Sequence, residues 1–193
     1  MGLVIAHVSM SLDGFVAGPD VGLQQPLGWG GERLHEWLFA EPLDPVDAEI
    51  ATAMTAEIGS VVLGHRTFTV GEAHWDGATP FPVPCFVLTH TPREDLPSGP
   101  TSFTFVTDGI ESALERARAA AGRGCVALMG AETIQQFLRA GLLDELQINL
   151  VPVLLGGGTR LFDLEGERVE LERTRLVGSP RVTHLRFRVA MPS

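Results

Sequence analysis

Residues 125–151, CVALMGAETIQQFLRAGLLDELQINLV, form the stretch that decides the fold, because they read as a strand, a helix and a second strand. The apolar runs Cys125–Met129 and Glu145–Val151 have the length and composition of buried strands. Between them, Thr133–Ala140 has helical spacing and is followed by Gly141, a residue that often ends a helix. Such a unit predicts two parallel strands with the helix packed on one face of their sheet.

The alternation of strand and helix continues through the rest of the chain. Further strands are predicted at Leu3–Ser9, Ser60–Gly64, Cys85–Thr89 and Phe103–Val106, and further helices at Asp44–Ile58 and Ile110–Ala121. The tail differs, because residues 168–189 hold two polar/apolar alternating runs joined by GSPR, the pattern of an antiparallel hairpin. The sequence therefore predicts an α/β protein with three layers, α/β/α, a mostly parallel central sheet and an antiparallel C-terminal hairpin.

The composition limits the classes of function. The 193 residues, 45% hydrophobic and 20% charged, are enough for a single domain, residues 1–193, with a large buried core. The formal net charge is −10, and all fourteen Lys or Arg residues are arginines. This acidic balance argues against nucleic acid as a partner, because such binding needs a basic surface. The lack of lysine excludes Schiff-base and P-loop lysine chemistry.

The sequence also gives no sign of export, of a membrane or of a metal site. No window approaches eighteen uninterrupted apolar residues and the N-terminus lacks a signal-peptide pattern, so we expect a soluble, cytoplasmic protein with no membrane partner. Cys85 and Cys125 lie inside apolar runs, which favours two buried thiols over a disulfide. The histidines show no ligand spacing, and no metal is predicted.

Hydrogen-bond donors follow three of the predicted strands. The three groups are Gly64, His65, Arg66 and Thr67; Thr89, His90 and Arg93; and Met129, Gly130, Ala131, Glu132, Thr133 and Ile134. The carboxyl ends of parallel strands meet at one edge of a sheet, and a helix N-terminus behind a glycine suits a phosphate. The simpler alternatives are that Glu132 and Thr133 merely cap their helix and that Arg93 is solvated. Basic residues gathered at strand ends favour an anionic ligand, and a dinucleotide would contact all three groups.

Four segments carry a resemblance to a known family. They are VSMSLDGFVAG (8–18), VVLGHRTF (61–68), FVLTHTPRE (86–94) and LMGAETIQQFLRAGLLDELQINLVPVLLGGGTRLF (128–162). In order and spacing they resemble the dihydrofolate reductase superfamily, and more closely the branch related to the C-terminal reductase domain of the bifunctional riboflavin-biosynthesis deaminase/reductase. The resemblance covers nearly the whole chain and implies a dihydrofolate-reductase-like fold.

The resemblance also implies a reductase that binds NADPH across the ends of the central strands. Residues 64–67 match the segment that holds the phosphates of the adenine half, and Thr89, His90 and Arg93 match the segment beside the 2′-phosphate and adenine. Residues 130–134 match the glycine pair and helix N-terminus around the pyrophosphate and nicotinamide ribose. The family's first glycine is Met129 here, so either Met129 takes that place or the turn differs.

The sequence leaves the proton donor open. Asp13 matches an aspartate of the family, although turn initiation with Gly14 explains it equally well. The carboxylate that folate-reducing enzymes carry near their first helix aligns with Leu34, which argues against folate reduction. Glu32 and His35 lie close by and are the alternative donors, unless they belong to a solvated helix face.

Two long loops, 19–31 and 71–84, are predicted to flank the ligand. Trp29 would belong to a lid over the nicotinamide, while His74 and Trp75 would form the opposite wall against a flat heterocycle. Ordinary packing is the alternative for Trp75.

These expectations combine into one function. We expect an NADPH-dependent reductase, a homodimer as related reductases tend to be, that transfers a hydride to a small heterocyclic or imine-like substrate. One alternative is the riboflavin-pathway reduction of 5-amino-6-ribosylaminouracil phosphate. Others are a dinucleotide-binding protein of the same fold without turnover and a structural domain that binds no dinucleotide.

Overall fold

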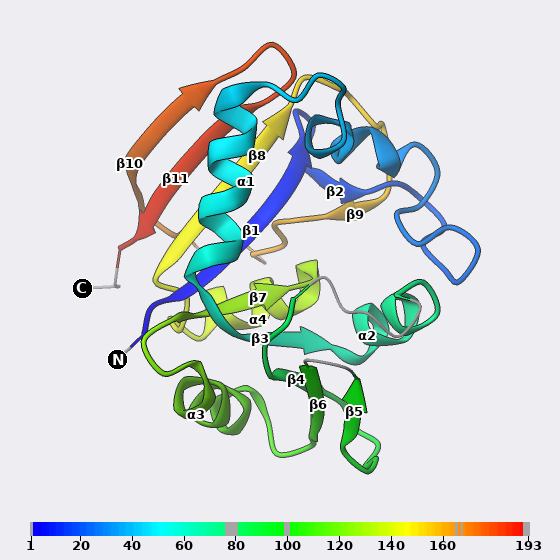
Figure 1. The fold of residues 1–193 in the computed structure, drawn as a ribbon, viewed down its shortest axis with the longest axis vertical. Helices are drawn as coiled ribbons and strands as arrows, with labels where there is room; N and C mark the ends of the chain where they lie inside the picture. Colours follow the sequence, from blue (N-terminus) through cyan, green and yellow to red (C-terminus); the bar gives the residue numbers. More distant parts are fainter. Residues whose placement is uncertain (1, 76–80, 99–100, 165, 167, 191–193) are drawn as a thin grey trace.

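The computed structural model of the protein describes residues 2–75, 81–98, 101–164, 166 and 168–190 (Figure 1). Within these residues the main feature is a nine-stranded sheet. In spatial order its strands are β10 (Leu171–Gly178), β11 (Thr183–Val189), β8 (Glu145–Val151), β1 (Val4–Ser11), β7 (Cys125–Met129), β3 (Ile58–Gly64), β4 (Cys85–Leu88), β6 (Thr101–Val106) and β5 (Leu96–Ser98).

The middle of the sheet is parallel, as the sequence predicts. The strands from β8 to β6 in this order pair in parallel, whereas β5, β11 and β10 pair antiparallel to their neighbours. Since parallel strands share one direction, the carboxyl ends of β1, β7, β3 and β4 lie along one edge of the sheet. The predicted C-terminal hairpin is confirmed, with β10 and β11 paired beside β8.

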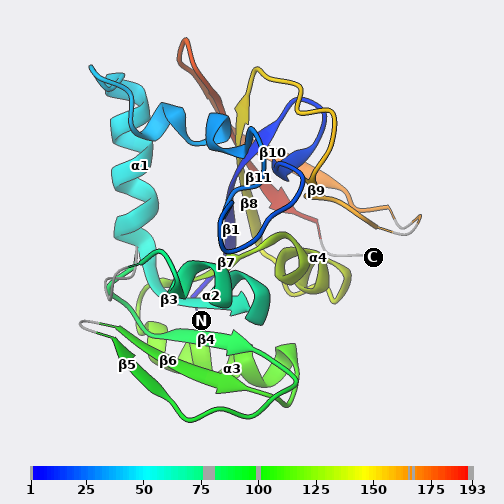
Figure 2. The ribbon, with the colours of Figure 1, turned by 90° about the vertical axis from the view of Figure 1, so that its right-hand side faces the viewer.

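Helices cover both faces of the sheet and make the three predicted layers (Figure 2). On one face α3 (Ile110–Ala121) and α4 (Ala131–Arg139) pack their apolar sides onto the sheet and form the largest core cluster. On the other face Phe68 of α2 (His65–Glu72) packs onto β3, β4 and β6. Beside it, α1 (Pro45–Glu57) lies over β8 and contacts Trp37 through a smaller cluster. The sheet is therefore buried on both sides, as its apolar strands require.

Smaller elements complete the fold. A two-stranded sheet joins β2 (Phe15–Ala17) to β9 (Thr159–Arg160), and the 3₁₀ helices η1 (Gly31–Leu34) and η2 (Glu36–Leu38) follow the first long loop. No helix in the described part of the chain has the length and apolarity that spanning a membrane requires.

The structure differs from the sequence prediction after β3. The segment HRTFTVGE is the helix α2, which the sequence prediction did not include. Its threonines, valine and glycine are weak helix formers, so the pattern gave no helical signal. Burial of Phe68 against Phe103 and Phe105, with ring centroids 4.9 and 5.2 Å away, stabilises the helix instead. The predicted loop 71–84 therefore begins inside α2, and its residues 76–80 lie outside the described residues.

Candidate functional site

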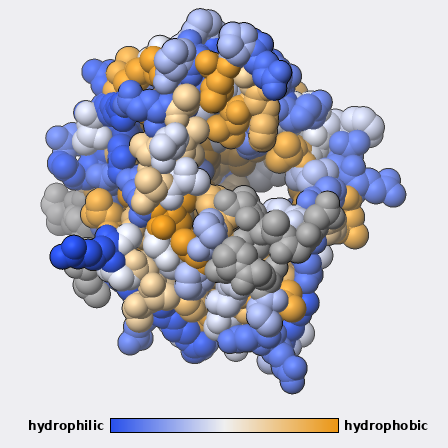
Figure 3. All heavy atoms as spheres, viewed as in Figure 1, coloured by the Kyte–Doolittle hydropathy of each residue, from blue (hydrophilic) through white to orange (hydrophobic). Residues whose placement is uncertain are grey.

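A cleft of about 1510 Å³ opens along the edge where the parallel strands end. Its walls come from the ends of β3, β4, β6 and β7, from the first turns of α2 and α4, and from the loop between β2 and η1. Figure 3 shows the molecule hollowed near its centre, with apolar side chains along part of the rim. The location agrees with the rule that open α/β sheets bind ligands beyond the carboxyl ends of their strands.

The cleft brings together the donors that the sequence analysis singled out, except Arg93. The predicted residues that line it are Gly64, His65, Arg66, Thr67, Thr89, His90, Met129, Gly130, Ala131, Glu132, Thr133 and Ile134. They come from three segments that are far apart in the sequence but adjacent in the strand order β7-β3-β4. The topology of the parallel sheet is thus what gathers them.

Two glycine turns fix how closely β3 and β7 bring their helices together. Gly130 has φ +95°, a region that disfavours side chains, and a Cβ atom there would overlap Thr67 Oγ1 of α2. A Cβ atom on Gly64 would lie 3.2 Å from Thr133 Oγ1 of α4. Each glycine therefore leaves space for a threonine side chain of the neighbouring helix to pack against it. The N-termini of both helices line the same cleft.

Both N-termini keep their backbone N–H groups free of side-chain caps. The N-cap residues are Gly64 and Gly130, and neither α2 nor α4 has a side-chain cap hydrogen bond. Among the described residues, neither Glu132 nor Thr133 makes a side-chain hydrogen bond to the first turn of α4, so the alternative in which they cap this helix is not supported. Free N–H groups and the positive ends of two helix dipoles suit a negatively charged group. Nearby, Arg66 Nη2 donates to the carbonyl oxygen of Val21, 3.2 Å away, and so links α2 to the long loop.

Arg93 does not reach the cleft, which corrects the prediction. Its guanidinium pairs with Glu72, with 2.9 Å between Nη2 and Oε1, and lies 5.3 and 5.0 Å from the ring centroids of Phe68 and Phe105. A cation already neutralised by Glu72 and packed on two rings is poorly suited to hold a phosphate as well. Of the residues predicted to hold the anion, the basic ones that line the cleft are His65, Arg66 and His90.

Of the three residues predicted to flank the ligand, His74 and Trp75 line the cleft and Trp29 does not. Trp75 also stacks on Phe103, with ring centroids 5.8 Å apart, so this side chain both packs in the core and lines the cleft. Trp29 is 62% exposed and lies outside the lining, because its loop turns it toward solvent. The predicted contact of Trp29 with a ligand in this cleft is therefore not supported.

Asp13 has a structural role rather than a place in the cleft. Its carboxylate accepts hydrogen bonds from Ser11 Oγ at 2.6 Å, Leu155 N at 3.1 Å and Gly156 N at 2.8 Å. The bond from Ser11 is the main reason why the pKa of Asp13 lies below its ordinary value, with the two amides adding to it. A carboxylate held ionised by three donors tethers the end of β1 to the 155–156 turn and is a poor acid.

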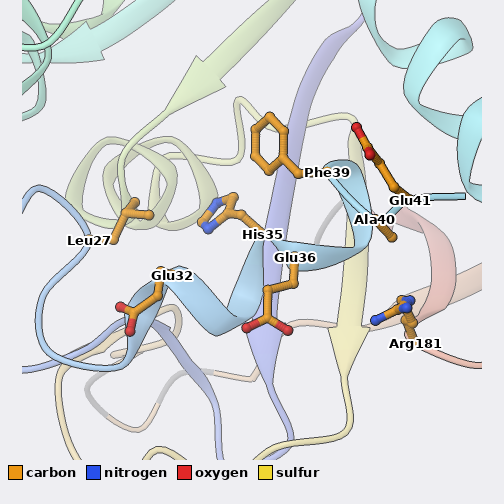
Figure 4. A pocket seen from close by; sticks show the side chains of 8 residues that line it. All are labelled: Leu27, Glu32, His35, Glu36, Phe39, Ala40, Glu41 and Arg181. Carbon is orange, nitrogen blue, oxygen red and sulfur yellow. The ribbon is translucent and has the colours of Figure 1, made fainter. Parts of the chain in front are cut away.

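Of the remaining candidates, the structure places His35 in the cleft and Glu32 outside it. Glu32 lines a separate hollow of about 460 Å³ with Glu36, Phe39 and Arg181. Figure 4 shows the Glu32 carboxylate and the His35 ring pointing in different directions from the η1 segment. His35 lines both hollows, and burial lowers its pKa, with a backbone hydrogen bond to Gly31 opposing the shift.

The sequence analysis missed several polar residues of the cleft, among them His7, Ser9 and Arg160. His7 and Ser9 project from β1, and Arg160 of β9 holds its guanidinium 4.6 Å above the Phe15 ring. In the segment HVSMS of β1, polar and apolar residues alternate although both faces of the strand are buried. The sequence therefore did not indicate that its polar residues face a cleft. Nothing in the sequence pairs Arg160 with this edge, because the contact depends on the β2–β9 pairing.

Two predictions concern the chemistry of other side chains. Cys85 and Cys125 are buried free thiols, as predicted, and burial raises the pKa of each to about 11. In the part of the chain that the structure describes, no group of three or more His, Cys, Asp or Glu side chains is arranged to hold a metal ion.

Comparisons with known proteins agree with this fold. A family model described as the RibD C-terminal domain matches residues 3–185. The chain is 26% identical over 186 residues to the uncharacterised protein YwjB of Bacillus subtilis (strain 168), covering 93% of this chain and 95% of that protein. A crystal structure of a Shewanella sp. PV-4 protein ascribed to riboflavin biosynthesis superposes with a TM-score of 0.74 and 24% identity, covering 97% and 99% of the two chains.

The fold is also that of dihydrofolate reductase. The enzyme from Enterococcus faecalis, solved as a complex with NADP(H), superposes with a TM-score of 0.59 and 17% identity, covering 97% of this chain and 96% of that one. At such identity the likeness establishes the fold alone. The resemblance predicted from the sequence is confirmed at the level of superfamily and branch.

Proposed function

Because the chain belongs to the RibD C-terminal domain family, we propose that it is a reductase that binds NADPH in this cleft and reduces a small heterocyclic or imine-like substrate. The observation that carries the proposal is the gathering of donors from three strand ends along one cleft. At about 1510 Å³ the cleft exceeds the roughly 300–1,000 Å³ of an ordinary small-molecule pocket, which leaves room for a dinucleotide and a second compound.

The residues of the cleft suit the parts of this cofactor. The uncapped N-termini of α2 and α4 would hold the pyrophosphate, and Gly130 has no side chain to obstruct it. His65, Arg66 and His90 would supply positive charge for the 2′-phosphate, which favours NADPH over NADH. Without Arg93, this preference depends chiefly on Arg66.

The chain must also exclude water, orient the substrate and donate a proton. When bound, NADPH supplies the hydride. His35 is the described residue of the cleft that we assign as proton donor, since Asp13 is held ionised and Glu32 lies elsewhere. Burial makes its imidazolium a stronger acid than usual, so its share of the reaction increases as the pH falls below the ordinary histidine range.

The name of the matched domain favours a second, narrower candidate. That candidate is the riboflavin-pathway reduction of 5-amino-6-ribosylaminouracil phosphate, on the ground that the family model is the RibD C-terminal domain. A dinucleotide-binding protein without turnover is the alternative outside enzymes. We further propose that the protein is cytoplasmic, that it forms a homodimer, and that the molecule it binds is a small-molecule substrate.

Oxidation of NADPH by a substrate panel tests the proposal. The purified protein is mixed with NADPH and with pyrimidinones, pterins and cyclic imines, and the loss of reduced-nicotinamide absorbance is followed. Turnover with one class, reduced at least about tenfold in His35→Asn with NADPH affinity unchanged, supports the reductase and its proton donor. Tight NADPH binding with no turnover across the panel would indicate the non-catalytic binder.

A further inference from the structure

The face of β1 that looks into the cleft carries two polar side chains with unused hydrogen-bonding capacity. Ser9 is 8% exposed and lines the cleft, and His7 lies two residues earlier on the same face. Their separation along the strand is about 6.6 Å, the repeat of a β-strand over two residues. Such groups are costly on a buried wall unless something bonds to them.

In the part of the chain that the structure describes, the Ser9 hydroxyl accepts one hydrogen bond but has no acceptor for its own hydrogen. Trp37 Nε1 lies 3.0 Å from Ser9 Oγ, and an indole nitrogen can only donate. Ser9 Oγ is therefore the acceptor in this bond, which leaves its own hydrogen free. None of the described residues accepts that hydrogen. Because Ser9 lines the cleft, the free donor is available to a compound bound there.

A buried network fixes the direction of this donor. Trp37 is 1% exposed and its ring packs edge-on against His184, with centroids 5.0 Å apart. His184 in turn lies between Asp47 Oδ1 at 3.0 Å and Asn149 Oδ1 at 2.8 Å, all of them buried. Trp37 can therefore move little, and it holds Ser9 Oγ in the accepting role.

His7 extends the same strip of polar groups. Its side chain is 6% exposed, and Nε2 lies 3.0 Å from Glu57 Oε1, although neither ring nitrogen meets a partner in hydrogen-bond geometry. Burial alone would raise the pKa of Glu57, but His7 and Arg186 together lower it. A carboxylate beside Nε2 favours a hydrogen on that nitrogen, which leaves Nδ1 as the ring nitrogen without a nearby partner among the described residues.

From these contacts we infer that Ser9 donates a hydrogen bond to an acceptor atom of the substrate, a carbonyl oxygen or an unprotonated ring nitrogen, and that Trp37 is its positioning residue. The inference rests on the proposed function, since it places the substrate in this cleft. It deepens that function by naming a requirement on the substrate: an acceptor at the β1 wall, which an apolar ring of equal size does not offer.

The test uses 2-pyridone, a flat lactam, as probe and toluene as its counterpart without an acceptor. The chain has three tryptophans, so the indole region of a nitrogen–proton correlation spectrum holds three signals, and Trp37→Phe identifies that of Trp37. Titration with 2-pyridone should move the Trp37 signal, because a hydroxyl that donates becomes a better acceptor. Toluene should leave it in place.

Variants then separate the roles of the two residues. Ser9→Ala should abolish the shift and weaken 2-pyridone about tenfold, whereas Ser102→Ala, an exposed serine on β6, should retain both. Affinities from the line widths of the probe should show that Trp37→Phe adds nothing to Ser9→Ala, as expected when one residue acts through the other. Equal shifts with and without Ser9, no shift in the wild type, or additive losses would each overturn the inference.

Titrating 2-pyridone with and without NADPH keeps the two proposals apart. A Ser9-dependent shift in a protein that binds no NADPH would leave the inference standing while the proposed cofactor fails. NADPH binding with no Ser9-dependent shift would do the reverse.

Discussion

Gly130 and Thr67 form the contact on which the geometry of the cleft depends. The glycine has φ +95°, and Thr67 Oγ1 of the neighbouring helix occupies the space that a Cβ atom would need. Because Gly130 is the N-cap residue of α4 and lines the cleft, this one position sets how closely a ligand can approach the N-terminus of α4. Substitutions at Gly130 and in its surroundings are therefore the sharpest tests at the scale of residues.

Gly130→Ala should both destabilise the protein and weaken NADPH. An alanine at this φ costs about 1–3 kcal/mol in backbone strain, and its Cβ overlaps Thr67 Oγ1. Urea denaturation measures the first effect and calorimetric titration the second. Gly141→Ala, also at positive φ but with open space around its Cβ, is the matched control that should lose stability without losing cofactor affinity. If both variants bind NADPH equally, the cofactor does not lie against Gly130.

Arg66→Ala should weaken NADPH far more than NADH, by about tenfold or more, because a guanidinium bound to a dianion contributes roughly 1.5–3 kcal/mol. The comparison of the two dissociation constants checks this, since removal of a merely structural link to Val21 would weaken both alike. Arg93→Ala is the control: paired with Glu72 outside the cleft, Arg93 should leave the ratio of the two constants unchanged.

Asp13→Asn should loosen the 155–156 turn and leave a pH signature. Because the pKa of Asp13 lies below its ordinary 3.8 in the fold, the stability that it contributes is fully present above 3.8 and is lost as the pH falls through the lower folded value. The wild type should therefore exceed the variant in stability at neutral pH, and the gap should close in strong acid. Faster amide exchange at Leu155 and Gly156 in the variant is the local readout, and an unchanged rate would contradict the tether.

At the scale of elements, α1 is attached to the sheet by polar contacts as much as by apolar ones. Asp47 on α1 is fully buried and meets His184 of β11, while Glu57 at the other end of the helix meets Arg186, with 3.1 Å between carboxylate and guanidinium. Since these contacts join residues more than a hundred positions apart, they fix the placement of α1 relative to the strands that form the cleft wall.

Removing one partner of the buried pair should cost more than removing a surface pair. Asp47→Ala should lower the free energy of unfolding by about 3 kcal/mol, because it leaves Nε2 of the buried His184 without its partner. Glu49→Ala, also on α1, breaks the exposed pair with Arg175 of β10 and should cost at most about 1 kcal/mol. Urea denaturation compares the two variants, and similar losses would show that Asp47 does not anchor α1.

The same scale explains what could be predicted from the sequence. Strands such as Cys125–Met129 and helices such as Ile110–Ala121 were predicted with the observed bounds, because apolar period and length are local signals. The donors after β3, β4 and β7 were predicted because parallel strands end at one edge. The role of Arg93 was predicted wrongly because its partner Glu72 lies 21 positions away in the sequence. The role of Asp13 was missed because the amides that bind its carboxylate lie more than 140 positions away. Such pairings form only in the folded chain.

At the scale of the whole molecule, the described sheet divides into two regions around the cleft. The ends of β7, β3 and β4 with α2 and α4 supply the donors that we assign to the cofactor. On the other side, β1 supplies His7 and Ser9, and the segment between η1 and η2 supplies His35. The cleft runs between them, so a ligand that fills it contacts both regions and should stabilise the entire fold.

The central claim is that this cleft binds a phosphorylated dinucleotide, and calorimetric titration of the wild-type protein with NADPH, and separately with NADH, tests it most directly. The account predicts micromolar binding of NADPH, weaker binding of NADH, and a loss of the NADPH affinity in Gly130→Ala but not in Gly141→Ala. Absence of heat with both nucleotides, or equal affinity of wild type and Gly130→Ala, would contradict the assignment of the strand-end donors to a cofactor.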